Sequence, residues 1–257
     1  SIVGGLLDSG HPAAMISAAD PFPDSLQRLR ELGDVAVHAE NTEAVSDADV
    51  VILAVKPQVM AEAAASISDA VQASGAVVIS IAAGITVASL RQRLGERTAV
   101  VRCMPNTPAL LRCGASGLYA SEGTSDTQRD YAGYILSAVG NTCWVNSEQD
   151  LDAITALSGS GPAYFFLFME AMIDAGAELG LDRDTATALA LQTGLGAARM
   201  ALENDVGLVE LRRRVTSPGG TTERAVQSFE QDGLRDLVAK AMRAAADRAA
   251  EMALEMG

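Results

Sequence analysis

The residues with the most chemical content lie in one stretch, 215–230, with the sequence VTSPGGTTERAVQSFE. Pro218 fixes its own φ, and the glycine pair 219–220 can adopt positive φ values and leaves its N–H groups unshielded. The threonine pair 221–222 then opens an amphipathic helical pattern. The free N–H groups and the positive end of such a helix attract an anion, and a threonine hydroxyl adds a donor. The stretch therefore predicts a binding site for a small carboxylate; a glycine-containing turn with a threonine-capped helix is the alternative.

The second half of the chain offers few groups for proton transfer. Both histidines, His11 and His38, lie in the first half, and the one lysine after residue 150 is Lys240. Oxidation of an alcohol needs a base at the reacting hydroxyl, usually a histidine or a lysine. Reduction of a cyclic imine needs less, because the substrate can arrive as an iminium and requires mainly orientation and a hydride. The residues therefore favour reduction of an imine that carries a carboxylate.

The scaffold expected for such a site begins with a Rossmann-type domain over residues 1–148. Short apolar segments rich in β-branched residues alternate there with helical stretches, which is typical of an α/β fold with a doubly wound, mostly parallel sheet. A weaker pair of strands brackets a helix at 127–139 and completes the domain. The predicted strands are 14–19, 35–39, 50–55, 76–83, 99–104, 116–121 and 142–147.

The pattern changes from about residue 149 to helices rich in Ala and Leu. Several of these helices are apolar around much of their circumference, which is typical of helices that bury a second face against another subunit. We therefore expect an all-α C-terminal dimerisation domain over residues 149–257 and a homodimer formed through it. The predicted helices lie near 150–158, 162–180, 182–204, 207–214, 221–232 and 234–256.

The first ten residues, SIVGGLLDSG, have the pattern of the last turns of a helix that ends at Gly10. In a doubly wound dinucleotide fold, a central strand and the glycine loop that holds the pyrophosphate come before the first helix. A sheet without that strand would leave neighbouring backbone groups unpaired. We therefore expect the first strand and the glycine loop to be missing from the chain as given.

Small or rigid residues follow three of the predicted strands, in the segments 56–58, 81–84 and 103–108. Because ligands bind at the carboxyl ends of parallel strands, these segments would let a flat cofactor approach the backbone. Asp20 follows another strand, at the position where an acid binds the ribose of NAD. An ordinary helix cap is the alternative role for Asp20.

Composition argues against several classes of partner. The formal net charge of −14 disfavours nucleic-acid binding, and the short basic cluster 212–214 is interpreted as a helix face. Cys103, Cys113 and Cys143 show no metal-ligand or disulfide spacing, so we expect no metal and interpret them as core or strand residues. No apolar run reaches the roughly 20 residues that span a bilayer. We expect no membrane partner and a cytoplasmic location.

Four motifs together resemble the pyrroline-5-carboxylate reductase family, and the similarity covers essentially the whole chain. They are AVKPQ (54–58), MPNTP (104–108), LSGSGPAYFF (157–166) and VTSPGGTTERAVQSFE (215–230), of which the last is distinctive of the family. The resemblance implies reduction of pyrroline-5-carboxylate to L-proline with NADPH or NADH, the last step of proline biosynthesis. It also implies a Rossmann domain followed by a helical dimerisation domain, and homodimers that often assemble further into decamers.

The resemblance also assigns roles to matching residues. Thr222, the predicted catalytic residue, would hydrogen-bond the ring nitrogen of the imino acid, with a helix N-cap as its alternative role. Segment 158–164 would shape the pocket wall, with Pro162 in the first turn of a helix. The residues expected to bind the substrate carboxylate are Ser217, Gly219, Gly220, Thr221 and Thr222. Those expected to bind the cofactor are Asn41 at the adenosine ribose or its phosphate, Met104 and Asn106 at the nicotinamide, and Ala54, Val55, Lys56, Pro57, Ala82, Ala83 and Gly84.

Two other functions stay open. A different two-domain NAD(P)-dependent reductase, such as a β-hydroxyacid dehydrogenase, would need a catalytic lysine on a helix of the second domain, and the sequence places none there. A catalytically silent dinucleotide-binding or scaffold protein is the other, suggested by the missing strand and loop. The cofactor preference also stays open, because Asp20 favours NADH while neighbouring polar groups can still accept NADPH.

Overall fold

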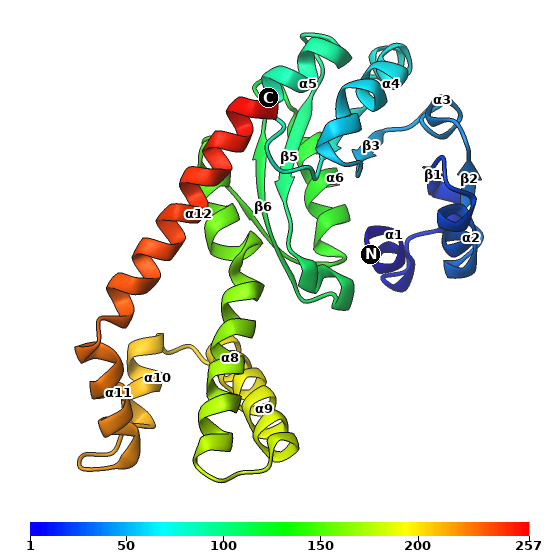
Figure 1. Cartoon of the computed structure of the whole chain (residues 1–257). Coiled ribbons are helices and arrows are strands. Elements are labelled where there is room, and N and C mark those ends of the chain that lie inside the picture. The colour runs from blue at the N-terminus through cyan, green and yellow to red at the C-terminus, as the bar shows by residue number, and fades with distance from the viewer. Residues whose placement is uncertain (257) are drawn as a thin grey trace. The chain divides into compact units, whose positions relative to one another are not determined.

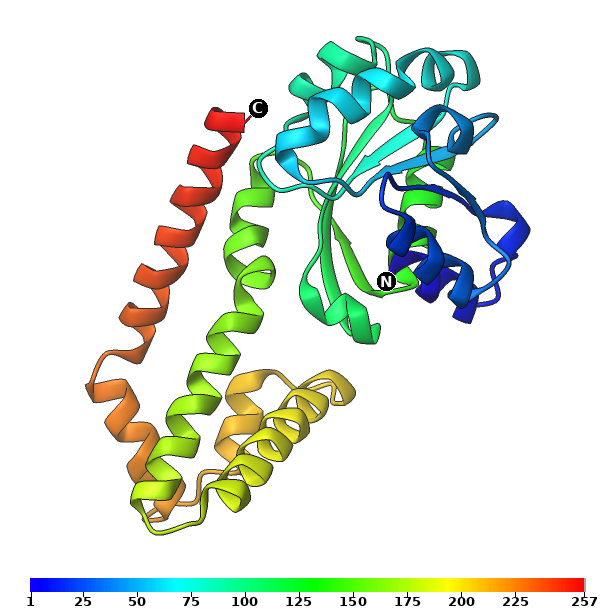
Figure 2. The same cartoon turned by 45° about the vertical axis from the view of Figure 1, so that its right-hand side comes forward.

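The computed structural model describes residues 1–256 and consists of two compact units. Unit 1 contains Ser1–Ser160 and the C-terminal segment from Ala244, and unit 2 contains Gly161–Arg243. Figure 1 labels most of the elements of both units, and Figure 2 shows the same structure turned by 45°. The predicted domain boundary at 148/149 stays a prediction.

The strands of unit 1 form two sheets. The smaller is a parallel pair, β1 (Ser17–Ala19) with β2 (Ala36–His38). The larger has the order β3 (Val50–Leu53), β4 (Val77–Ser80), β5 (Val100–Met104), β6 (Gly114–Ala120) and β7 (Gly140–Trp144). β3, β4 and β5 are parallel, whereas β6 is antiparallel to β5 and parallel to β7. All seven predicted strands are present and the mostly parallel α/β fold is confirmed, but the reversal at β6 was not predicted.

Helices connect these strands, and their ends follow local sequence signals. The predicted helix at the chain's start is present, and α6 begins with a capping box in which the Ser125 and Gln128 side chains bond each other's backbone N–H groups. The strand that we expect upstream of the first helix stays a prediction. The helices of unit 1 are α1 (Ile2–Asp8), α2 (Pro23–Leu32), α3 (Asn41–Ala44), α4 (Met60–Ser74), α5 (Val87–Leu94), α6 (Asp126–Ser137) and α7 (Asp150–Ile154), with shorter turns η1 (Ala13–Met15), η2 (Pro57–Val59), η3 (Thr107–Leu111) and the π-turn η4 (Thr155–Gly159).

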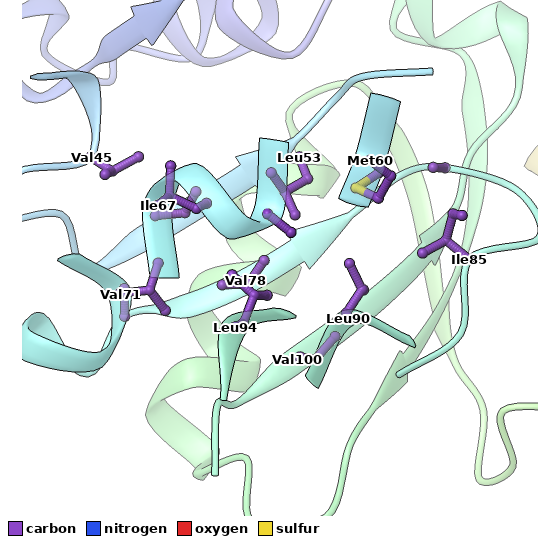
Figure 3. Close-up of a cluster of buried hydrophobic side chains, with 14 of the residues drawn as sticks. Val45, Leu53, Met60, Ile67, Val71, Val78, Ile85, Leu90, Leu94 and Val100 are labelled. Atoms are coloured by element: carbon purple, nitrogen blue, oxygen red, sulfur yellow. The ribbon is translucent and has the colours of Figure 1, made fainter. Parts of the chain in front are cut away.

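The central strand β4 of the larger sheet is buried on both faces, as its consecutive apolar residues predict. Side chains alternate along β4, so Val78 faces one cluster while Val77 and Ile79 face the other, and all three are fully buried. Figure 3 shows the first cluster, in which residues of α4 and α5 such as Ile67 and Leu90 cover the sheet. This two-sided burial fixes the strand ends that carry the predicted cofactor residues.

The cysteines only partly follow the prediction. Cys103 lies buried on β5, where burial raises the pKa of its thiol to about 12 and a hydrogen bond from Ser116 acts in the opposite direction. Cys143 lies exposed on β7. Cys113 lies exposed in the loop before β6, so its interpretation as a core or strand residue was wrong. Among residues 1–256, no group of three or more potential ligands is arranged to hold a metal ion.

Unit 2 is helical, as predicted. α8 and α9 pack side by side, and Figure 2 shows this pair. Phe165 and Phe166 on α8 are 67% and 62% exposed, so an apolar face of this helix is left uncovered by the other residues of unit 2. None of the helices in the described part of the chain is long and apolar enough to cross a membrane. The helices are α8 (Gly161–Glu178), α9 (Arg183–Glu203), α10 (Leu208–Arg214), α11 (Thr221–Gln231) and α12 (Leu234–Met256), whose last turns belong to unit 1.

Candidate cofactor and substrate sites

The carboxyl ends of β3, β4 and β5 lie along one edge of the larger sheet and carry most of the predicted cofactor residues. The loop after β3 exposes Ala54 and Lys56, while Val55 packs against the first core cluster. Pro57 then starts the short turn η2 that leads into α4. The exposed Ala54 leaves the backbone of this loop accessible to a flat ligand, as a dinucleotide requires.

A cavity of about 30 Å³ lies where β4 and β5 end. It brings together four predicted cofactor residues, Ala82, Ala83, Gly84 and Met104. A space of this size holds a water molecule but not a nicotinamide ring, so a dinucleotide would lie over this edge. The other lining residues are Arg102, Cys103, Leu151, Asp152, Thr155, Ala249 and Met252.

Position 84 requires a glycine because of its backbone conformation and because neighbouring atoms leave no room for a side chain. Its φ is +76°, and a Cβ atom there would lie 2.7 Å from Cε of Met256 and 3.2 Å from the carbonyl oxygen of Met252. The last turns of α12 therefore pack directly against the loop that carries three predicted cofactor residues. The sequence offered no sign of this contact, because the two segments are far apart in the chain.

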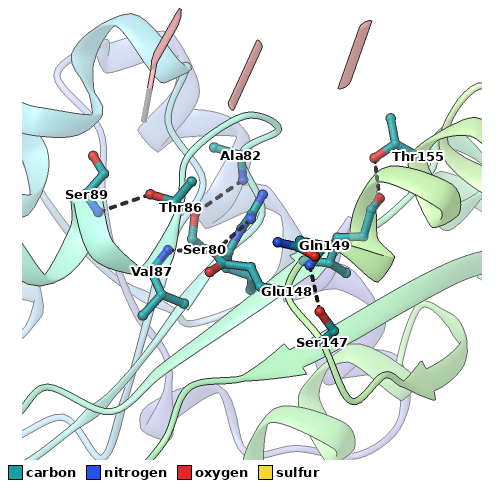
Figure 4. Close-up of polar contacts among 11 residues, drawn as sticks. Ser80, Ala82, Thr86, Val87, Ser89, Ser147, Glu148, Gln149 and Thr155 are labelled. Atoms are coloured by element: carbon teal, nitrogen blue, oxygen red, sulfur yellow. Dashed lines mark hydrogen bonds and ion pairs between the residues drawn. The ribbon is translucent and has the colours of Figure 1, made fainter. Parts of the chain in front are cut away.

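A partly buried ion pair supports the same loop. Arg102 on β5 donates from Nη1 to Oε1 of Glu148 at 2.8 Å, with side-chain exposures of 10% and 28%. The same oxygen accepts the backbone N–H of Val87 at 2.7 Å, and Figure 4 shows Glu148 beside Val87. Val87 is the first residue of α5, so Glu148 caps this helix from a distant part of the chain. The pair therefore fixes the point where the loop after β4 enters its helix.

Asp152 faces the same cavity. Burial raises the pKa of its carboxyl group above the usual range, the charge of Arg102 acts in the opposite direction, and the charge of Glu148 raises the pKa further. The sequence analysis missed Arg102, Glu148 and Asp152. An arginine inside the apolar segment VVRCM was the available signal, because a buried arginine requires an acidic partner.

Two predicted cofactor residues are already engaged by the protein. The Asn106 side chain donates from Nδ2 to the carbonyl oxygen of Ser158 at 3.0 Å and accepts the N–H of Ala115 at 2.9 Å, so it joins the end of β5 to β6 and η4. The Asn41 side chain, at the start of α3, donates to Oγ of Ser66 on α4 at 3.0 Å. Both amides therefore hold segments in place at the sites predicted for the two ends of the cofactor.

The predicted substrate residues lie together where unit 2 turns from α10 into α11. Gly219 has a φ of +72°, as its turn requires, and the N–H of Gly220 donates to the carbonyl oxygen of Ser217 at 3.0 Å. Gly220, not Thr222, is the N-cap of α11, and no side chain caps this helix. The alternative role of Thr222 as a helix N-cap is therefore wrong, and its exposed hydroxyl is available for another use.

A carboxylate of the protein already reaches this anion site. Oε2 of Glu223 accepts the N–H of Gly219 at 2.8 Å. The arginines of the cluster 212–214 do not supply a free cation, because Arg213 and Arg214 pair with Glu210, and Arg212 pairs with Glu230. This pairing agrees with the interpretation of the cluster as a helix face. The donors near this turn are therefore hydroxyls and the N–H groups of the first turn of α11, and the exposed side chain of Arg224 follows in the same helix.

Two family models match the chain. "Pyrroline-5-carboxylate reductase dimerisation" matches residues 148–252, and "NADP oxidoreductase coenzyme F420-dependent" matches residues 1–84. Together they cover the start of unit 1 and nearly all of the helical half. The second description agrees with the small-residue strand edge found here, which suits a nicotinamide dinucleotide.

Several proteins that are similar along nearly the whole chain are pyrroline-5-carboxylate reductases. The pyrroline-5-carboxylate reductase of Pseudomonas aeruginosa is 54% identical and that of Pasteurella multocida 46% identical, over 100% and 98% of this chain and 94% and 93% of theirs. The solved pyrroline-5-carboxylate reductase of Coxiella burnetii matches with a TM-score of 0.96 at 44% identity, covering 98% of this chain and 93% of its own. The Plasmodium falciparum enzyme, solved with NADP bound, matches with a TM-score of 0.83 at 28% identity and the same coverage. The chain belongs to the pyrroline-5-carboxylate reductase family.

Proposed function

We propose that this protein reduces pyrroline-5-carboxylate to L-proline with NAD(P)H. The observation that carries the proposal is the 54% identity with the Pseudomonas aeruginosa reductase along the entire chain. The same match favours this function over the two alternatives, a catalytically silent binder and a β-hydroxyacid dehydrogenase. The carboxylate site at the start of α11 supplies a chemical reason for the substrate class.

The cofactor is assigned to the sheet edge of unit 1. Bound NAD(P)H supplies the hydride. The backbone of Ala54–Pro57 and of 82–84 would lie against it, with Asn41 at the adenosine end and Met104 and Asn106 at the nicotinamide end. The support for this assignment is the cavity that groups the residues after β4 and β5, and the amide contacts that fix Asn41 and Asn106.

The substrate carboxylate is assigned to the start of α11. Ser217, Gly219, Gly220 and Thr221 would bind it through N–H groups and hydroxyls, and Thr222 would hydrogen-bond the ring nitrogen. Reduction requires that the imine carbon and the nicotinamide meet. No residue has to remove a proton from the substrate, which suits a helical domain with a single lysine.

We also propose an assembly and a location for the protein. A homo-oligomer is supported by the matched dimerisation model and by the exposed apolar face of α8. A decamer, a cytoplasmic location and the domain ranges 1–148 and 149–257 are part of the proposal.

The deciding experiment is a spectrophotometric assay. Purified protein with pyrroline-5-carboxylate is expected to oxidise NADH or NADPH, followed at 340 nm as about one cofactor per proline formed. Bound cofactor without turnover of the imine would instead support the silent binder.

Removing the charge of Glu223 is expected to tighten substrate binding. Glu223→Gln keeps an oxygen for the Gly219 N–H but no longer repels the incoming carboxylate, so the KM for pyrroline-5-carboxylate should fall about fivefold, as expected for about 1 kcal/mol between solvated charges. The control is Asp232→Asn, the same charge change at the other end of α11. An unchanged or higher KM in the Glu223 variant would show that this carboxylate does not compete with the substrate.

A further inference from the structure

We propose that this protein selects NADH over NADPH and that Asp20 is the specificity-determining residue. The inference rests on the proposed function, because it places the adenosine half of the cofactor at the carboxyl ends of β1 and β2. It concerns a choice between two cofactors that family membership leaves open.

Backbone pairing fixes the position of Asp20. The last residue of β1, Ala19, pairs with His38 on β2, and the N–H of Asp20 donates to the His38 carbonyl oxygen at 3.3 Å. Asp20 is therefore the first residue beyond the carboxyl end of β1. In a doubly wound fold, an acid at such a strand end accepts hydrogen bonds from the ribose hydroxyls of NAD.

The side chain of Asp20 is also held in place. Its Oδ1 accepts the N–H of Phe22 at 2.8 Å, which closes a short turn. Pro21 and Pro23 restrict the backbone on either side of Phe22. One carboxylate oxygen is therefore used by the turn, and the other remains to accept from a ribose hydroxyl. The hydrogen bond from the Phe22 N–H also favours this position of the carboxylate when a phosphate approaches.

The surrounding charge disfavours the extra phosphate of NADPH. Residues 20–26 and 39–46, which follow β1 and β2, contain no lysine or arginine and four acids: Asp20, Asp24, Glu40 and Glu43. His38 Nδ1 lies 3.2 Å from Oε2 of Glu43. Arg28 lies further along α2, and its Nε donates to the carbonyl oxygen of Asp24. A 2′-phosphate would therefore meet like charge, and these two segments supply no matching lysine or arginine, which is how a site rejects the wrong ligand.

The test compares the two cofactors in catalysis and in binding. The wild-type kcat/KM is expected to be at least about tenfold higher for NADH than for NADPH, and the Kd values from fluorescence titration without substrate should show the same order. Asp20→Asn removes the charge but keeps an oxygen for the Phe22 N–H, and should reduce this preference at least about tenfold. Asp24→Asn, the same charge change on the first turn of α2, should reduce the preference clearly less than Asp20→Asn does, because Asp24 contributes only to the surrounding charge.

Each other outcome overturns the inference. Equal or tighter binding of NADPH by the wild type would contradict it, and so would an unchanged preference in both Asp20→Asn and a second variant, Asp20→Ser. The thermal midpoint of each variant shows that it is folded. Because the titration needs no substrate, loss of the proposed function would appear as cofactor binding with the expected preference but no imine reduction, which separates the two failures.

Discussion

Replacing Glu148 with alanine is expected to destabilise unit 1 by roughly 3 kcal/mol. The change leaves the Arg102 guanidinium without its partner inside the protein and removes the acceptor for the Val87 N–H. Removing one member of a buried ion pair costs about 3–5 kcal/mol, and the lower end applies because Glu148 keeps 28% of its side chain exposed. The thermal midpoint should fall by roughly 6–12 °C. Scanning calorimetry measures this shift directly.

Two controls separate the lost charge pair from a simple loss of packing. Glu148→Gln keeps an oxygen acceptor for both donors, so its midpoint should lie between those of the wild type and the alanine variant. Adding Arg102→Met to Glu148→Ala removes the unpaired charge and should recover part of the lost stability. If Glu148→Ala melted within about 1 °C of the wild type, the ion pair would not be holding α5 and its loop.

The elements were predictable where the signal is local. Continuous apolar strands such as β4 reveal two-sided burial in their own residues, and the helices of unit 2 begin and end near capping residues or glycines. The direction of β6 was not predictable, because SGLYAS has no feature that distinguishes a parallel from an antiparallel neighbour. Strand direction depends on the path of the connecting chain, which local patterns do not contain.

The candidate sites also combine features that depend on local sequence with contacts between distant residues. The turn and helix at 215–230 could be predicted because glycine, proline and threonine determine the conformation of the residues next to them. The hydrogen bond between Glu223 and the Gly219 N–H could also have been predicted, since an acid at the third helical position commonly accepts a backbone N–H near the start of its helix. By contrast, the bonds from Glu148 to Arg102 and Val87 join residues 46 and 61 positions apart. Such contacts exist only after the sheet has formed.

Removing the hydroxyl of Thr222 is expected to give the largest loss of activity with little loss of stability. Gly220 caps α11, so Thr222→Ala breaks no cap and places a better helix former in the first turn. A hydrogen bond between the protonated ring nitrogen and this hydroxyl, being charge-assisted, contributes about 1.5–3 kcal/mol. The kcat/KM for pyrroline-5-carboxylate should therefore fall roughly 10- to 150-fold at an unchanged melting temperature.

Matched substitutions at the same position distinguish the hydroxyl from the shape of the side chain. Thr222→Ser keeps the hydroxyl and should retain most of the activity, whereas Thr222→Val keeps the branched shape and should lose as much as the alanine variant. If the valine variant reduced pyrroline-5-carboxylate as efficiently as the wild type, the ring nitrogen would not depend on Thr222. The substrate would then be oriented by the backbone N–H groups at the start of α11 alone. Neither substitution changes these groups.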